Sequence, residues 1–274
     1  MTGSDAQYVA QQYSTDEALR LRIETHRQYG IGSKEDLFVR VTRLMAGRLA
    51  PERVLDIGAG TGGWYRAIRQ SFPDRVAYTA VDQSSGMVAV LQEAVQQDPL
   101  GRALQADADA LPFPEATFDW TGAHFMLYHV PDISGAIAEA LRVTRSGGLV
   151  AAATNAAQPY RELWELGDWA ACELGRLGAQ SSQRVRFNLD NGASFFPHEP
   201  ERIVWEGGFR FDASEPALRY LASGPIRHHL GPGADEAQVT TALTLIKGRI
   251  DKIIRREGSF TVHSQSGLFL LEKD

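Results

Sequence analysis

The feature that most constrains this 274-residue sequence is the run RVLDIGAGTGG at residues 53–63. An apolar triplet leads into Asp56, glycine then occupies three alternate positions, and the residues that follow have a helical pattern. The run predicts a strand that turns tightly into the N-terminus of a helix. Glycine permits positive φ and lets another molecule approach the backbone, and the N–H groups at a helix start favour an anionic group. The turn therefore predicts a cofactor site.

The spacing of the glycines allows two interpretations. Gly58, Gly60 and Gly63 satisfy the dinucleotide fingerprint G-x-G-x-x-G, which is a weak signal by itself. Asp56 stands two residues before the first glycine, where a carboxylate gains nothing beside two phosphates but suits a ligand with a cationic amino group. Alternatively, Asp56 accepts hydrogen bonds from the N–H groups of its own turn.

The segment LDIGAGTG at residues 55–62 resembles motif I of the class I S-adenosylmethionine-dependent methyltransferases, most closely the bacterial small-molecule, type 11-like members. In that family the turn holds the methionyl portion of the cofactor, whose sulfonium carries the methyl group. The resemblance covers residues 8–154 well and the end of the chain loosely. It implies that S-adenosyl-L-methionine contacts Asp56, Gly58, Ala59 and Gly60. It also implies that Asp56 has both roles, bracing the turn and attracting the methionyl amino group directly or through water.

Composition and charge limit the partners. The net charge is −6 and the pI is about 5.7, which disfavours a nucleic-acid partner. Cys172 is the only cysteine, so an intramolecular disulfide and a zinc site built on several thiolates are excluded. No apolar run approaches the roughly 18 residues that span a bilayer. We expect a cytoplasmic protein with no membrane partner, either a monomer or a homodimer.

After residue 51, the hydrophobic pattern predicts strands that alternate with helices. Strands are expected at residues 53–57, 76–82, 103–107, 118–125 and 149–154. This pattern indicates an α/β fold with a mostly parallel sheet covered on both faces, and the resemblance implies that the sheet is Rossmann-like. A helix at 235–256 and a β-hairpin of 259–263 with 268–271 follow, and the hairpin would add an antiparallel strand.

Four segments are expected along the chain. Residues 1–50 form an N-terminal helical cap, and 51–154 form the core that binds S-adenosylmethionine. Residues 155–235 are rich in aromatics and too long for a simple connection, so they predict an inserted substrate or lid lobe. Residues 236–274 return to complete the core sheet.

Acidic residues at strand ends extend the predicted site. Asp82 follows the second strand and is expected to accept from the ribose hydroxyls, although it could instead cap the next helix. By resemblance, Gln83 and Met87 flank the adenine, although Met87 could equally be a core residue. The segment DADALPF at 107–113 resembles the family's adenine segment, which implicates Asp107 and Ala108.

Four further residues complete the predicted site. Ala123 and His124 end the fourth strand, where ligands bind in open α/β sheets. His124 is the candidate catalytic base, with burial in the core as the alternative. Tyr13 and Tyr29 belong to a segment that resembles a helical cap over cofactor and acceptor, with amphipathic packing as the alternative. The sequence Arg227-His228-His229 places two histidines side by side, but no further ligands stand at the spacing of a metal site, so we expect no metal.

Together these features predict an enzyme that transfers a methyl group from S-adenosyl-L-methionine to the O, N or C atom of a small-molecule acceptor. Transfer would be a direct in-line displacement, to which the protein contributes positioning and exclusion of water. The alternatives are an NAD(P)-dependent oxidoreductase that uses the same glycines, and a cofactor-binding protein without catalysis.

Overall fold

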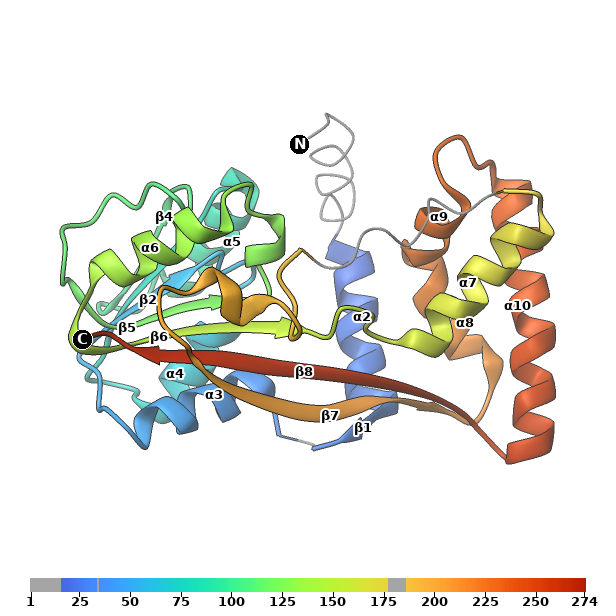
Figure 1. Cartoon of the computed structure of the whole chain (residues 1–274), viewed down its shortest axis with the longest axis horizontal. Coiled ribbons are helices and arrows are strands. Elements are labelled where there is room, and N and C mark those ends of the chain that lie inside the picture. The colour runs from blue at the N-terminus through green and yellow to red at the C-terminus, as the bar shows by residue number, and fades with distance from the viewer. Residues whose placement is uncertain (1–15, 34, 177–185) are drawn as a thin grey trace. The chain divides into compact units, whose positions relative to one another are not determined.

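The computed structural model describes residues 16–33, 35–176 and 186–274 (Figure 1). The chain divides into two compact units, each assembled from three segments. Unit 1 comprises residues 1–34, 158–184 and 206–265, and unit 2 comprises 35–157, 185–205 and 266–274.

Unit 2 is built on five parallel strands. They run in the order β6-β5-β2-β3-β4 and alternate with helices along the chain, which confirms the predicted α/β fold with a mostly parallel sheet. Their bounds are β2 Arg53–Ile57, β3 Ala77–Asp82, β4 Gly101–Gln105, β5 Phe118–His124 and β6 Thr144–Asn155. All five are close to the expected strands, but β4 ends two residues earlier and β6 begins five residues earlier.

The expected antiparallel strand near the end of the chain is present, but it is not part of a hairpin. Residues 260–272 form one continuous strand, β8 (Phe260–Glu272), which pairs antiparallel with β6, so the predicted hairpin is wrong. The polar residues 264–266 resemble a turn, but they are half-buried strand residues, and at Gly267 the carbonyl of Ile203 approaches too closely for a Cβ. The glycine permits a close approach of two strands and makes no turn.

Two strands were not predicted. Strand β7 (Glu201–Phe211) lies next to β8, and the short edge strand β1 (Gly30–Gly32) pairs antiparallel with β7. The complete order is β1-β7-β8-β6-β5-β2-β3-β4. Both β7 and β8 contribute residues to each unit.

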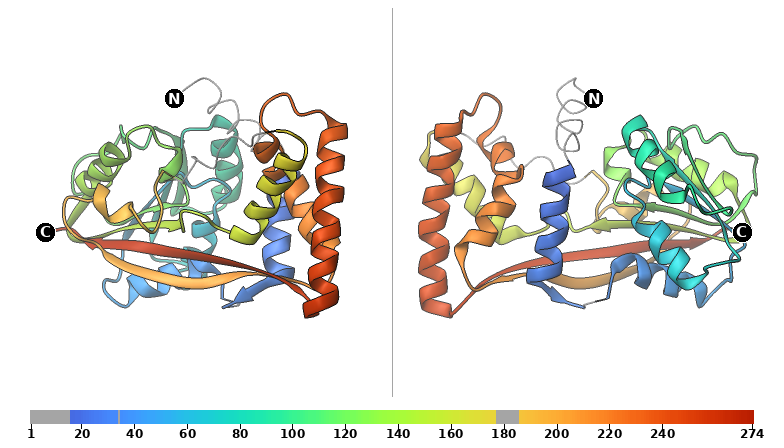
Figure 2. Two further views of the ribbon diagram at one scale, coloured as in Figure 1. Left: turned by 45° about the vertical axis from the view of Figure 1, so that its right-hand side comes forward. Right: turned by 180° about the vertical axis from the view of Figure 1, so that it is seen from behind.

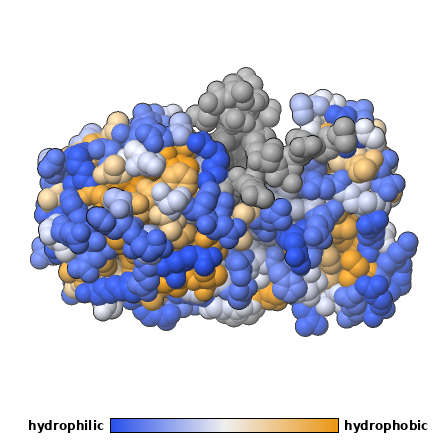
Figure 3. Space-filling model, in the orientation of Figure 1, coloured by the Kyte–Doolittle hydropathy of each residue, from blue (hydrophilic) through white to orange (hydrophobic). Residues whose placement is uncertain are grey.

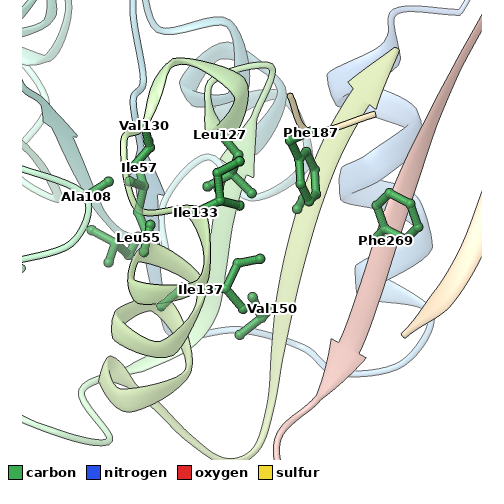
Figure 4. Close-up of a cluster of buried hydrophobic side chains, with 14 of the residues drawn as sticks. Leu55, Ile57, Ala108, Leu127, Val130, Ile133, Ile137, Val150, Phe187 and Phe269 are labelled. Atoms are coloured by element: carbon green, nitrogen blue, oxygen red, sulfur yellow. The ribbon is translucent and has the colours of Figure 1, made fainter. Parts of the chain in front are cut away.

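Helices cover both faces of the sheet in unit 2. Alternate residues of a strand point to opposite faces: Val54 packs with α3 (Leu37–Ala46) and α4 (Gly63–Ser71), whereas Leu55 packs with α6 (Ile133–Val143). Figure 4 shows the hydrophobic cluster on the α6 face, where Ile133 and Ile137 of α6 lie together with Leu55. Helix α5 (Ser85–Val95) and the short turns η1 (Leu127–His129) and η2 (Gly192–Phe195) complete the unit.

Unit 1 contains the other helices of the described residues. They are α2 (Asp16–Tyr29), α7 (Arg161–Glu173), α8 (Ser214–Ala222), α9 (Pro225–Leu230) and α10 (Glu236–Glu257). Helices α7 to α10 pack on one another (Figure 2), and α10 buries one stripe at Val239, Ala242, Ile246 and Ile250. The visible side of α10 is mainly hydrophilic (Figure 3), as expected for an amphipathic helix.

The observed units cut across two of the expected segments. Helix α3, expected in the N-terminal cap, lies in unit 2, and α10, expected with the core, lies in unit 1. Among the residues that the structure describes, no helix is both long and apolar enough to cross a membrane.

Candidate functional site

The turn between β2 and α4 has the backbone that its glycines predict. Gly58, Gly60 and Gly62 have φ values of 64°, 54° and 76°, a region that residues with a side chain rarely adopt. A Cβ added at Gly60 would meet no atom within 4 Å. The turn therefore presents bare backbone with open space beside it, as a cradle for a ligand requires.

Asp82 ties this turn to the end of β3. Its Oδ2 accepts from the Gly60 N–H at 3.0 Å, and its Oδ1 accepts from the Ser84 N–H at 2.9 Å. The N-cap of α5 is Ser84, whose Oγ accepts from the Met87 N–H at 3.4 Å. The half-buried Asp82 carboxylate uses one lone pair of each oxygen in these bonds, so further lone pairs are available to a ligand.

Asp56 lies beneath the turn, on the face covered by α3 and α4. It is 2% exposed, and its Oδ2 accepts a hydrogen bond from the Tyr78 hydroxyl. Burial raises the pKa of Asp56 to about 7, with the Tyr78 bond acting against this rise and the negative charge of Asp82 adding to it. The alternative, in which the Asp56 carboxylate braces its own turn, is not the arrangement that the structure describes.

The predicted adenine residues lie at and beyond the ends of β3 and β4. Asp82 pairs with Gln105, so Gln83 and Asp107 follow neighbouring strand ends. Gln105 Nε2 donates to the Gln83 carbonyl at 2.9 Å, and Asp107 forms an isolated bridge with Ala110. The side chains of Gln83 and Asp107 are exposed, Met87 is half-buried and Ala108 is buried.

The end of β5 completes this edge of the sheet. Ala123 pairs with Ile57, which precedes the glycine turn. His124 is buried, and its ring lies edge-on to Trp64 of α4 at 4.5 Å and to Phe38 of α3 at 5.9 Å between ring centroids. In the described part of the chain, neither His124 ring nitrogen has a hydrogen-bond partner. Burial lowers the pKa of His124 to about 3, so the ring is neutral at physiological pH.

Three neighbours of the turn were missed by sequence reasoning. The Phe38 ring packs on Gly63, where an added Cβ would collide with it, and an added Cβ at Gly58 would lie 2.7 Å from Met126 Cγ. Met126 follows Phe125, which has a positive φ of 56° that turns the chain after β5. Of these three, the role of Tyr78 could have been inferred from the sequence, because a tyrosine hydroxyl inside an apolar strand needs a buried hydrogen-bond partner.

The remaining predicted residues lie elsewhere. Tyr13 is outside the described residues. Tyr29 lies in unit 1 at the end of α2, and its ring packs on Phe211 at 5.2 Å. His229 is also in unit 1, buried, with its Nδ1 2.8 Å from Asp168 Oδ1. No group of three or more His, Cys, Asp or Glu side chains placed to hold a metal occurs among the residues described.

Comparison with known proteins gives consistent matches. The family model named methyltransferase domain matches residues 55–152. A ubiquinone/menaquinone biosynthesis C-methyltransferase from Geobacter sulfurreducens is 40% identical over 99 residues, which are 35% of this chain and 39% of that protein. A demethylmenaquinone methyltransferase from Staphylococcus aureus is 28% identical over 186 residues, which are 65% of this chain and 75% of that protein.

A solved structure extends the likeness of fold beyond the matched domain. The phosphoethanolamine N-methyltransferase 2 of Haemonchus contortus, in complex with phosphomonomethylethanolamine and S-adenosylhomocysteine, superposes with a TM-score of 0.57 at 15% identity. The superposition covers 97% of this chain and 59% of that one. At 15% identity, the match supports a similar fold and nothing further.

Proposed function

We propose that this chain is a class I S-adenosylmethionine-dependent methyltransferase, which transfers the methyl group of S-adenosyl-L-methionine to a small-molecule acceptor. The match of residues 55–152 to the methyltransferase domain and the relatives named as methyltransferases support the proposal. The observation that carries the proposal is the bare glycine turn, open at Gly60 and tied to the carboxylate of Asp82. The matches do not support an NAD(P)-dependent oxidoreductase or a protein without catalysis.

We assign the cofactor to the carboxyl-end edge of β2, β3, β4 and β5. Ligands bind at this edge in open α/β sheets. Asp82 would accept from the ribose hydroxyls, and Asp56 would favour the methionyl ammonium. The other proposed contacts are Gly58, Ala59 and Gly60 with the methionyl portion, Gln83, Met87, Asp107 and Ala108 with the adenine, Ala123 at the end of β5, and Tyr13 and Tyr29 in the cap.

The bound cofactor supplies an electrophilic methyl group on a positively charged sulfur. The chain has to orient the acceptor in line with that methyl group and to exclude water from it. A base is needed only when the acceptor loses a proton. The relatives named for demethylmenaquinone make demethylmenaquinone the first acceptor to test, and the acceptor atom stays open.

His124 is our candidate base for an acceptor that loses a proton. Burial lowers its pKa to about 3, which keeps the ring unprotonated but also makes it a weak base. Both ring nitrogens are buried, so an acceptor would have to reach one of them. The His124→Phe variant tests this role. Loss of methyl transfer with unchanged cofactor affinity would support the role of His124 as a base. Full activity of the variant would rule out that role.

Calorimetry with S-adenosylhomocysteine is the direct test of the proposed function. We expect one site per chain for S-adenosylhomocysteine and no heat of binding with NADH. Absence of binding by both S-adenosylmethionine and S-adenosylhomocysteine would refute the proposal. The cytoplasmic location and the monomeric or homodimeric state stay predictions, which fractionation and size-exclusion chromatography test.

A further inference from the structure

A buried hydrogen bond lies beneath the glycine turn. The Tyr78 hydroxyl donates to Asp56 Oδ2, and both side chains are withdrawn from solvent. The strand register explains the contact, because Tyr78 pairs with Val54, and Asp56, two residues further on, pairs with Ala80. Tyr78 is thus the diagonal neighbour of Asp56 on the same face of the sheet, within reach of a long side chain. Ala80, which pairs directly with Asp56, has a side chain that cannot form a hydrogen bond with the carboxylate.

We propose that Tyr78 is a positioning residue, which holds the Asp56 carboxylate ready to recognise the ammonium group of S-adenosylmethionine through this buried hydrogen bond. The inference rests on the proposed function. It adds a residue in the interior of β3 to a site otherwise made of loops and strand ends.

The charges around Asp56 support the need for such a partner. Among the described residues, Asp56 has no ion-pair partner: the nearby cation Arg69 of α4 is bound to Asp98 instead. Without a cation, burial favours the protonated carboxyl and raises its pKa to about 7. The Tyr78 hydroxyl favours the ionised form, and its own pKa is well above the usual range, so it stays a donor.

The other titratable groups on this face do not replace Tyr78. Tyr65 of α4 packs its ring on Tyr78 at 5.2 Å, but its hydroxyl donates to Asp98 at 2.9 Å. Asp82, at the end of β3, is negative and opposes ionisation of Asp56. His124 of β5 is on the same face and is neutral because burial lowers its pKa to about 3. A ligand ammonium is therefore the cation that the Asp56 carboxylate lacks.

The proposal makes cofactor affinity depend on pH. An ammonium binds the ionised carboxylate, so affinity rises with pH as Asp56 loses its proton near pH 7. Removing the Tyr78 hydroxyl raises the Asp56 pKa further and moves this rise to higher pH. Each pKa unit changes the protonation equilibrium tenfold, so a shift of about one unit would weaken binding about fivefold at pH 7.

The experiment compares the affinity for S-adenosylhomocysteine of the full chain and three variants by calorimetry between pH 5.5 and 7.5. The ligand α-amino group is that of a free amino acid, which is more basic than a peptide N-terminus of pKa about 7.7–8.0, so it stays charged in this range. Tyr78→Phe should bind more weakly at pH 7 and show its rise in affinity at higher pH. Tyr65→Phe is the matched control, because it removes a neighbouring hydroxyl that does not contact Asp56, and it should follow the wild type. Asp56→Asn should lose the pH dependence.

Two results would overturn the inference: Tyr78→Phe with the affinity and pH profile of the wild type, or Asp56→Asn with the wild-type pH dependence. Thermal unfolding checks that Tyr78→Phe is folded, and if it is not, Asp56→Asn decides. A wild-type chain that binds no S-adenosylhomocysteine at any pH refutes the proposed function itself. Binding without pH dependence overturns only the role of Tyr78 and Asp56.

Discussion

Asp82 connects the glycine turn with α5 through two backbone hydrogen bonds, so its carboxylate is fixed before any ligand binds. We predict that Asp82→Ala weakens the binding of S-adenosylhomocysteine at least about tenfold, since a hydrogen bond to a charged group contributes roughly 1.5–3 kcal/mol. Calorimetry measures the effect. Asp109→Ala, an exposed aspartate of the neighbouring loop, is the control. Equal affinities of the two variants would contradict a ribose contact.

The buried His124 should make the folded state less stable at acid pH. Its pKa is lowered from an ordinary 6.5 to about 3 by burial, so the unfolded chain binds the proton more readily than the folded one. The stability that follows is present above pH 6.5 and is lost as the pH falls toward 3, by at most about 1.4 kcal/mol per pH unit. His124→Phe keeps an aromatic ring beside Trp64 and should flatten this slope.

Urea unfolding between pH 7 and 4 measures the effect of His124. His198→Phe alters an exposed histidine and should retain the wild-type slope. An unchanged slope in His124→Phe would mean that other groups control acid unfolding.

The site residues divide into those that sequence reasoning could reach and those that it could not. The positive φ values of the glycine turn and the placement of Asp82 follow from local rules, because glycine spacing and a strand-end acid are both readable in one short segment. The contacts of Phe38 and Met126 with the turn depend on which helix and loop pack there. Such contacts join residues far apart in the chain, and no local pattern specifies them.

Among the elements, the parallel strands and an antiparallel strand near the end of the chain were predictable, but β1, β7 and the continuity of β8 were not. Strands β2, β3 and β5 are short apolar runs bounded by turn residues, a strong local signal. Strand β7 contains two consecutive glycines and charged residues, and β8 carries a polar stretch in its middle. Both are stabilised by their neighbours in the sheet, so tertiary pairing overrides the local signal.

A substitution at Gly267 tests whether β8 is a continuous strand packed closely against its neighbour. A side chain there would collide with the carbonyl of Ile203, so we predict that Gly267→Ala lowers the free energy of unfolding by about 1–3 kcal/mol. Gly248→Ala is the matched control: it lies in α10, has open space around it, and should raise stability by up to about 1 kcal/mol. Chemical denaturation measures both. A neutral Gly267→Ala would argue against close strand packing at this position.

At the scale of the molecule, the matched methyltransferase domain is not the same as the folded unit. The family match ends at residue 152, yet unit 2 also takes residues 185–205 and 266–274 from later in the chain. Those segments supply Phe187, Phe196 and Phe269 to the hydrophobic core on the α6 face. They also supply the part of β8 that pairs with β6, which would otherwise be an exposed edge.

We therefore predict that a fragment of residues 35–157 does not fold cooperatively, although it contains the whole matched domain and every strand of the parallel sheet. Removing a buried phenylalanine side chain costs about 3–5 kcal/mol, and the fragment lacks three that are buried in one core. Such a loss is comparable to the 5–15 kcal/mol that stabilise a whole domain. Circular dichroism during urea titration should show a gradual change for the fragment and a sigmoidal transition for the full chain. A sigmoidal transition in the fragment would mean that the parallel strands and their helices are sufficient for cooperative folding without the core residues of 185–205 and 266–274.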